Sequence, residues 1–253
     1  MGVPLSRPEV SEFTSPEFEH AFQPIIDIHT GDVFGYEALL RGVENQPPWY
    51  LFEQVEKKHA ANFEKRINTA ALRKQRELGN PYHTFLNVTS SSLIEDSGQY
   101  LIDFTPKASS ISASNVVLEL SEGSIIHNFK HFVRTLNNLR SAGFSIAMDD
   151  FGAGYAGLNA LVEVHPDIIK LDMYLIRDIQ ESGPRQATVR AIVSLCEALG
   201  ILVLAEGVEK LKEYDFLCNQ GIHLYQGFLF AKPEINYLEK SIELPNRTRS
   251  TLS

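Results

Sequence analysis

Residues 22–41, FQPIIDIHTGDVFGYEALLR, decide the fold. Two apolar runs, Phe22–Ile28 and Val33–Leu40, are typical of strands, and only the short stretch HTGD separates them. Thr30-Gly31 is a turn signal. So short a link can make only an antiparallel hairpin, because a parallel crossover needs about a dozen residues or more. The sequence therefore predicts one antiparallel joint near its start.

The rest of the chain alternates short apolar runs with segments of helical periodicity. This alternation favours an α/β architecture with a mainly parallel sheet. Eight strands over about 250 residues is the size of a closed (β/α)8 barrel, so we predict such a barrel with one reversed strand. The further strands are expected at Thr84–Val88, Val116–Leu120, Phe144–Met148, Ile168–Leu171, Ile201–Ala205 and Ile222–Leu229. Helices are expected at Leu51–Leu78, Phe129–Ser141, Arg185–Leu199 and Lys210–Asn219.

The length and charge of the chain limit what it can be. Its 253 residues, 43% of them hydrophobic, suit one large domain, which we place at residues 20–240. Residues 1–19 and 241–253 are expected to be tails. The net charge of −9 disfavours a nucleic-acid polymer or an acidic membrane as a partner, since both attract a basic surface.

The sequence also bears on the cellular compartment. No stretch approaches the roughly 20 apolar residues that span a bilayer, and no secretory signal opens the chain. Cys196 and Cys218 lack metal-ligand spacing and are expected to be reduced. A cytoplasmic protein without a membrane segment is the resulting prediction.

Polar residues gather at the carboxyl ends of the expected strands. Because side chains alternate along a strand, Val116, Leu118 and Leu120 should face outer helices while Glu119 points into the barrel. Barrel enzymes keep their active sites at this end. By the same alternation, the inward polar residues are Glu37, Arg41, Asn87, Glu119, Asp149, Lys170, Asp172 and Glu206.

Residues 148–158, MDDFGAGYAGL, place Asp149 beside Asp150, so that five carboxylates share one mouth with Lys170. Such a cluster cannot stay ionised without cations. Carboxylate oxygens with one amide suit Mg²⁺ or Mn²⁺. Two divalent ions would nearly neutralise the cluster, with Asp150 already on a turn so that both aspartates reach the ions. A pair of such ions suits in-line hydrolysis of a phosphoester.

Each of these residues also has an ordinary structural explanation. A single strand-end carboxylate is usually a helix cap or a hydrogen-bond acceptor, and Lys170 or Arg41 alone would usually form an ion pair. Residues 152–157, GAGYAG, match a dinucleotide-binding pattern, with Asp172 at the expected distance. We reject that match because two carboxylates before the loop would repel a pyrophosphate. Six oxygen ligands converging on one mouth favour the metal site.

The sequence resembles the EAL family of bacterial cyclic di-GMP phosphodiesterases, named for the tripeptide Glu37-Ala38-Leu39. The resemblance runs from FQPIID at 22–27 to YQGFLFAKP at 225–233. It includes YEALLR, LNVTSSSL, LELSEGS, MDDFGAGYAGL, IIKLD and LAEGVE. It implies a modified TIM barrel with one antiparallel strand, and hydrolysis of cyclic di-GMP to linear pGpG by a two-metal mechanism.

The resemblance also implies roles for the acidic residues and the lysine. One Mg²⁺ or Mn²⁺ would be held by Glu37, Asn87, Glu119 and Asp149. The second would be held by Asp149, Asp150 and Glu206. Lys170 would hold the attacking water and Glu206 is a candidate general base, although a metal-bound hydroxide could suffice. Ca²⁺ is expected to inhibit, because it is larger and less suited to tight octahedral geometry.

Substrate binding and assembly follow from the same resemblance. Arg41, Gln226 and Gln23 are expected to bind the substrate, with Arg41 on a phosphate. Glu122 matches a glutamate that steadies the Asp-Asp loop, which in the family is tied to a homodimer. Two alternatives stay open, namely a cyclic di-GMP receptor without turnover and a protein-interaction domain.

Overall fold

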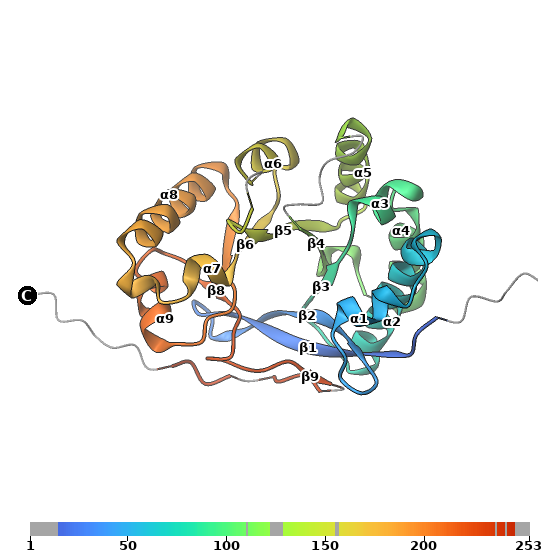
Figure 1. The fold of residues 1–253 in the computed structure, drawn as a ribbon, viewed down its shortest axis with the longest axis horizontal. Helices are drawn as coiled ribbons and strands as arrows, with labels where there is room; N and C mark the ends of the chain where they lie inside the picture. Colours follow the sequence, from blue (N-terminus) through green and yellow to red (C-terminus); the bar gives the residue numbers. More distant parts are fainter. Residues whose placement is uncertain are drawn as a thin grey trace, which may run out of the picture.

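The computed structural model describes residues 15–109, 111–121, 129–154, 157–235, 237–240 and 242–245. Within these residues the strands form one sheet of nine, in the order β2-β3-β4-β5-β6-β7-β8-β1-β9, and β1 also pairs with β2, so the sheet closes on itself (Figure 1). The strands are β1 Phe18–Asp27, β2 Asp32–Gly42, β3 His83–Asn87, β4 Val116–Ser121, β5 Ser145–Phe151, β6 Ile168–Leu171, β7 Leu202–Ala205, β8 Leu224–Tyr225 and β9 Glu234–Ile235.

Helices cover much of the outside of this sheet, whereas β1, β2 and β9 form its lower side in the view (Figure 1). Neighbouring strands from β2 to β8 are parallel, whereas β1 runs antiparallel to both β2 and β8. The molecule is therefore a (β/α)8-type barrel with one reversed strand, which confirms the predicted fold. The helices are α1 Pro48–Glu53, α2 Ala60–Glu77, α3 Ser90–Glu95, α4 Gln99–Ser109, α5 Phe129–Ser141, α6 Gly157–Val164, α7 Met173–Ile176, α8 Gly183–Leu199 and α9 Leu211–Cys218.

The hairpin between β1 and β2 accounts for the reversed strand. Gly31 N donates to Asp27 O at 2.8 Å and closes the turn. Gly31 has φ +77°, a conformation that glycine adopts without the steric cost of a Cβ. The Asp27 side chain accepts a further bond from His29 N at 2.9 Å. The predicted antiparallel joint is confirmed.

The helix predicted at Leu51–Leu78 is wrong in one respect, because the chain breaks between α1 and α2. Pro48 occupies the first turn of α1, where its missing N–H costs nothing. The chain then leaves the helical path at Gln54, and a short 3-10 helix at Lys57–His59 precedes α2. The break lets Val55 join the buried side chains of Leu40, Leu51, Phe63 and Ile67.

The last parallel strand is also shorter than the predicted Ile222–Leu229. After Tyr225 the backbone leaves the sheet, and Gln226 O accepts from Val208 N at 3.1 Å. At Gly227 the backbone passes so close to Val208 that an added Cβ would lie 2.1 Å from its carbonyl oxygen. Glycine is required there, and the strand ends before it.

The barrel interior has an apolar layer with a polar layer next to it. The apolar layer is a buried cluster on the inner face: Ile25, Phe85, Val117, Ala147, Ile168, Leu204 and Leu224. Because side chains alternate, the residue two positions after each apolar-layer residue of a parallel strand faces the same side of the sheet. On the reversed β1 the matching residue lies two positions earlier. The polar layer made in this way consists of Gln23, Asn87, Glu119, Asp149, Lys170, Glu206 and Gln226. Glu37 of β2, which pairs with Gln23, joins this layer through its contacts with Asn87 and Lys170.

The opposite faces of the strands build the larger core against the helices. Val116, Leu118 and Leu120 are fully buried there, as the alternation predicted. At the C-terminal end, Ile242 and Leu244 pack against this core. The domain limits at 20 and 240 stay predictions.

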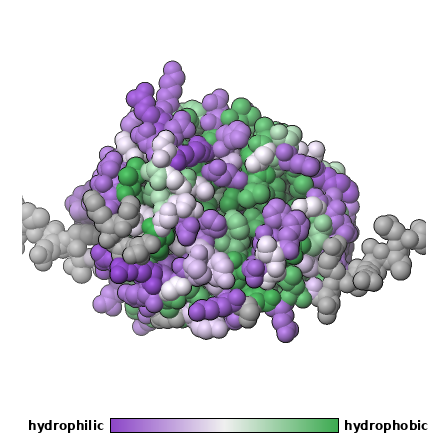
Figure 2. Space-filling view, turned by 180° about the vertical axis from the view of Figure 1, so that it is seen from behind, coloured by the Kyte–Doolittle hydropathy of each residue, from purple (hydrophilic) through white to green (hydrophobic). Residues whose placement is uncertain are grey.

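The molecular surface mixes polar and apolar side chains. Seen from behind, hydrophilic side chains follow much of the outline, and hydrophobic ones show between them across the middle (Figure 2). Among the residues that the structure describes, no helix combines the length and the apolar character needed to cross a bilayer.

Candidate active site

Lys170 of β6 lies at the centre of the polar layer. Its side chain is fully buried, and Nζ lies 2.7 Å from Glu119 Oε1 and 3.0 Å from Asp149 Oδ1. Nζ also lies 3.3 Å from Glu206 Oε2 and 3.4 Å from Glu37 Oε2. Among the described side chains, one ammonium thus faces four carboxylates. The cluster keeps surplus negative charge when all of them are ionised.

The pKa values of the cluster reflect this surplus. Burial, and then repulsion by Glu37, raise the pKa of Glu119 well above its usual range, although Lys170 opposes the shift. Burial raises the pKa of Glu206 to about 8, against the lowering effect of Lys170. Burial lowers the pKa of Lys170, but the surrounding carboxylates outweigh it and raise that pKa well above its usual value. The site is therefore short of positive charge.

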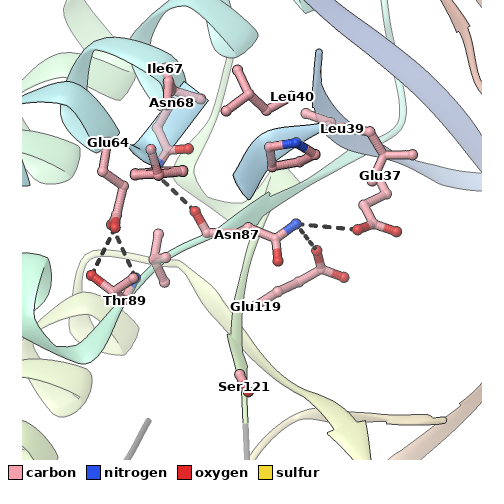
Figure 3. Close-up of a pocket in the computed structure, with 14 residues that line it drawn as sticks. Glu37, Leu39, Leu40, Glu64, Ile67, Asn68, Asn87, Thr89, Glu119 and Ser121 are labelled. Carbon is pink, nitrogen blue, oxygen red and sulfur yellow. Dashed lines mark hydrogen bonds between the residues drawn. The ribbon is translucent and has the colours of Figure 1, made fainter. Parts of the chain in front are cut away.

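Asn87, at the end of β3, bridges two of the carboxylates. Its Nδ2 donates to Glu37 Oε1 and to Glu119 Oε2, each at 3.2 Å (Figure 3). The amide oxygen of the same side chain takes no part in these two bonds. Asn87 can therefore offer a neutral oxygen to a cation held by the same carboxylates.

Gln226 and Gln23 tie the first and last strands of the barrel to Glu37. Gln226 Nε2 donates to Glu37 Oε2 at 2.7 Å and to Gln23 Oε1 at 3.3 Å. Gln23 Nε2 donates in turn to Ala231 O at 3.1 Å. Within the described residues, the buried Gln226 Oε1 has no hydrogen-bond partner. The structure thus brings both glutamines to the site, and their contact with a substrate stays a prediction.

Asp149 and Asp150 are separated by the backbone conformation. Asp149 faces Lys170, whereas Asp150 has φ +56°, and the pairing of β5 with β6 is irregular between Met148 and Phe151. This left-handed residue breaks the simple alternation as an irregularity inside β5, which continues to Phe151, so the expectation that Asp150 already lies on a turn is wrong. Burial and the neighbouring Asp149 raise the pKa of Asp150.

The loop after Asp150 needs its first glycine. Gly152 has φ +97°, and an added Cβ would lie 2.3 Å from Leu175 Cδ1. Tight packing against α7 therefore explains this glycine without a bound dinucleotide. Tyr155 and Ala156 of the same motif lie outside the described residues.

Three further sequence-predicted residues are not brought into the carboxylate cluster by any described contact. Arg41 lies at the end of β2, partly exposed, and its Nη1 donates to Leu40 O at 2.7 Å. Asp172 follows the end of β6 at Leu171, and its side chain caps α7 by accepting from Tyr174 N at 2.7 Å. Its charge also helps to raise the pKa of Asp150, and its inward orientation stays a prediction. Glu122 lies outside the described residues, so its role stays a prediction.

A cavity of about 400 Å³ opens beside the carboxylates. Glu37, Asn87 and Glu119 form its polar end (Figure 3). Its apolar wall includes Pro48 and Phe52 of the α1 segment. A ligand that fits this space needs an apolar face at one end and groups suited to cations or amides at the other.

Two polar residues of α2 that line this cavity were not predicted from the sequence. Glu64 and Asn68 are both buried, and both bind the backbone that follows β3 (Figure 3). They lie four positions apart on the face that also buries Phe63 and Ile67. Polar residues at core positions of an amphipathic helix are the pattern that would have revealed them.

The chemistry of the cluster fits a hard divalent cation. Over the described part of the chain, no three side chains of His, Cys, Asp or Glu are arranged to hold a metal ion together. Lys170 Nζ lies between the carboxylates instead, within 3.4 Å of each. The donors are carboxylate and amide oxygens with surplus negative charge, which is the set that Mg²⁺ and Mn²⁺ prefer. The residues therefore fit Mg²⁺ or Mn²⁺ in their chemistry, whereas thiolates and imidazoles for zinc are not part of the cluster.

The sequence matches a known protein family and is similar to individual members of known function or name. The profile of the EAL domain family matches residues 10–233. The blue light- and temperature-regulated antirepressor BluF of Escherichia coli is 32% identical over 220 residues, covering 85% of this chain and 54% of BluF. The cyclic di-GMP phosphodiesterase RocR of Pseudomonas aeruginosa is 31% identical over 232 residues, covering 86% of this chain and 57% of RocR. The chain thus spans just over half the length of these two relatives.

Solved structures agree with the sequence comparison. BlrP1 of Klebsiella pneumoniae, in a manganese and cyclic di-GMP complex at pH 9.0, superposes with a TM-score of 0.84 at 34% identity, covering 93% of this chain and 60% of BlrP1. A standalone EAL protein of Vibrio cholerae O395, bound to c-di-GMP, gives 0.78 at 31% identity, covering 91% of this chain and 97% of that one. The fold, the carboxylate cluster and these matches together show that the chain belongs to the EAL domain family.

Proposed function

We propose that this chain hydrolyses cyclic di-GMP to linear pGpG with two bound Mg²⁺ or Mn²⁺ ions. The observation that carries the proposal is the ring of four carboxylates around Lys170, with the Asn87 amide, at the carboxyl ends of the barrel strands. RocR, 31% identical, is named a cyclic di-GMP phosphodiesterase. BlrP1 has been solved with manganese and cyclic di-GMP together.

Each acidic residue has a part in this proposal. When bound, the two ions would polarise the phosphate and lower the pKa of a water molecule. One ion would be held by Glu37, Asn87, Glu119 and Asp149. The other would be held by Asp149, Asp150 and Glu206. These residues keep the donors fixed on rigid strand ends, which maintains the site's geometry.

Lys170 and Glu206 would handle the attacking water. Lys170 would orient the water through its ammonium group. Glu206 would accept the proton, because its side chain, 32% exposed, is the most accessible of the four carboxylates around Lys170. An acceptor must reach the water that it deprotonates, and the more buried Glu119 is enclosed.

The substrate would lie across the mouth of the barrel and into the cavity. Arg41 would leave the Leu40 carbonyl to bind a phosphate, for which its planar guanidinium provides two parallel donors. Gln226 would offer its Oε1, which has no partner among the described residues, to a donor on the nucleotide, and Gln23 holds the Gln226 amide in place.

A homodimer in the cytoplasm completes the proposal. Helix α6 exposes Leu158 and Val162, four positions apart, at 63% and 71%. An apolar pair on one helix face suits a contact with a second copy, to which the Glu122 segment would be tied. Both cysteines are free, which agrees with a reducing compartment.

A cyclic di-GMP receptor without turnover is the second candidate. BluF, 32% identical over 85% of this chain, is named an antirepressor. The test is to incubate the purified chain with cyclic di-GMP and Mg²⁺ or Mn²⁺ and to separate the products by chromatography. Linear pGpG supports hydrolysis. Tight binding without pGpG supports the receptor, and neither binding nor product supports an interaction domain.

A further inference from the structure

Helix α2 holds the chain segment that carries Asn87. Asn68 Nδ2 donates to the backbone carbonyl oxygen of Asn87 at 3.2 Å. Glu64, one helical turn earlier, accepts from Thr89 N at 3.0 Å and from Thr89 Oγ1 at 2.7 Å (Figure 3). The two side chains therefore bind the backbone on both sides of Val88.

These contacts are strong because both side chains are buried. Glu64 is 5% exposed and Asn68 is 3% exposed. A buried polar group that loses its partner is costly, and bonds to a carboxylate are stronger than bonds between neutral groups. Asn68 Nδ2 also lies 3.3 Å from Tyr100 Oη of α4, so a third element fixes its orientation.

The held segment leads directly to the carboxylate cluster. The Asn87 side chain reaches both Glu37 and Glu119, so a shift of its backbone would move the amide away from both. Groups that orient a metal ligand through hydrogen bonds commonly change metal affinity or activity by about 10 to 100-fold when they are removed.

We propose that Glu64 and Asn68 are positioning residues, which aim Asn87 at the cluster and so set the affinity of the site for its first divalent ion. This inference rests on the proposed function for the identity of the metal site. It assigns no contact between these two residues and the substrate. Their action passes through residues 87–89, at the backbone of Asn87 and Thr89 and at the Thr89 hydroxyl.

The test uses two variants with different severity. Asn68→Leu keeps a similar volume and removes the donor, whereas Glu64→Gln keeps one acceptor oxygen for Thr89. In the absence of nucleotide, calorimetric titration with Mn²⁺ should show a Kd about tenfold higher for Asn68→Leu and a smaller increase for Glu64→Gln. Hydrolysis by Asn68→Leu should fall at limiting Mn²⁺ and recover at saturating Mn²⁺, a split that general damage to the fold would not give.

A spectroscopic readout follows Asn87 itself. The side-chain amide signals of Asn87 can be identified in metal-free protein by their loss in Asn87→Asp. These signals should shift in Asn68→Leu. Gln75→Leu is the matched control, because Gln75 lies in the same helix, is fully buried, and within the described residues its side-chain amide has no hydrogen-bond partner. It should leave both the Mn²⁺ Kd and the Asn87 signals unchanged.

The outcomes separate this inference from the proposed function. A wild-type Kd and unshifted Asn87 signals in Asn68→Leu overturn the inference, even when the wild type hydrolyses cyclic di-GMP. A wild type that binds Mn²⁺ without hydrolysis overturns the proposed function alone, and the Kd ratio still decides the inference. A wild type that binds no Mn²⁺ overturns both. Should Asn68→Leu fail to fold, Glu64→Gln gives the answer by the same two measurements.

Discussion

Lys170 Nζ lies 2.7 Å from Glu119 Oε1, and both side chains are completely buried. Such a pair is stable only while its charges compensate each other, since an uncompensated buried charge is strongly unfavourable. The relationship makes the lysine a structural counter-ion of the carboxylates as well as a candidate catalytic residue. The consequences for stability can be measured.

Lys170→Met should destabilise the metal-free protein by roughly 3–5 kcal/mol, because it leaves four carboxylates without their ammonium partner. Added Mn²⁺ should raise the melting temperature of this variant more than that of the wild type, since the ion would replace the missing charge. Denaturant unfolding with EDTA and with Mn²⁺ measures both effects. Lys212→Met, at an exposed position of α9, is the control. Wild-type stability of Lys170→Met in EDTA would refute the counter-ion role.

Removal of a group that supports a metal ligand commonly lowers activity by about 10 to 100-fold. Glu37→Ala would remove a proposed ligand itself, so it should lower the hydrolysis of cyclic di-GMP by more than about a hundredfold. Glu37 receives bonds from Asn87 and Gln226 and faces Lys170, so its carboxylate links several parts of the site. Circular dichroism should show an intact fold. Glu53→Ala, at an exposed position of α1, should keep full activity. A fully active Glu37→Ala would discredit the metal assignment.

Ca²⁺ should permit binding of cyclic di-GMP and suppress its hydrolysis. Ca²⁺ is larger than Mg²⁺ and tolerates irregular coordination, so it holds a ligand without imposing the tight octahedral geometry that the reaction needs. A calcium and cyclic di-GMP complex of BlrP1 has been solved, with a TM-score of 0.83 to this chain. Equilibrium binding of labelled nucleotide and chromatography of the product, each with Ca²⁺ and with Mn²⁺, make the comparison. Rapid turnover in Ca²⁺ would contradict it.

His20 of β1 should make the fold sensitive to mild acid. Its ring lies between those of Phe18 and Phe22, at centroid distances of 5.6 and 6.2 Å, and burial lowers its pKa to about 4 from a usual 6.5. Between pH 4 and pH 6.5 the unfolded chain therefore binds more protons than the folded chain. The contribution of the buried, neutral His20 to the free energy of unfolding is complete above pH 6.5 and is lost as the pH falls towards 4.

The expected size of this effect is about 2 kcal/mol of unfolding free energy between pH 7 and pH 5. Urea unfolding of the wild type and of His20→Leu at both pH values measures it. The difference between the two proteins isolates His20, because both carry the same carboxylate cluster. Equal losses in the two proteins would show that burial of His20 has no such effect.

Several features of the site were predictable because they depend on local sequence. A period of two along each strand assigns Glu119, Asp149 and Lys170 to the inner face, and the structure places all three there. The same rule does not extend to Asp172, where the strand has already ended and the side chain caps a helix. A periodicity rule holds only as far as the element does.

Other features depended on contacts between distant residues. The bond between Gln226 and Gln23 joins positions 203 apart in the sequence, and no local pattern links them. In the sequence, Glu64 and Asn68 belong to an ordinary amphipathic helix. Their role depends on the backbone at the end of β3, which packs against them in the folded chain. The break in the predicted long helix likewise follows from burying Val55 in a cluster of several elements.

By itself, the sequence determined the reversed first strand, the barrel and the side of each strand on which a polar residue lies, because turn length and alternation are properties of neighbouring residues. Only the tertiary structure decided that Lys170 would lie within 3.4 Å of four carboxylates, and that α2 would hold Asn87 in place. Closure of the barrel brings these strand ends together, and the resulting distances depend on how every strand and helix packs.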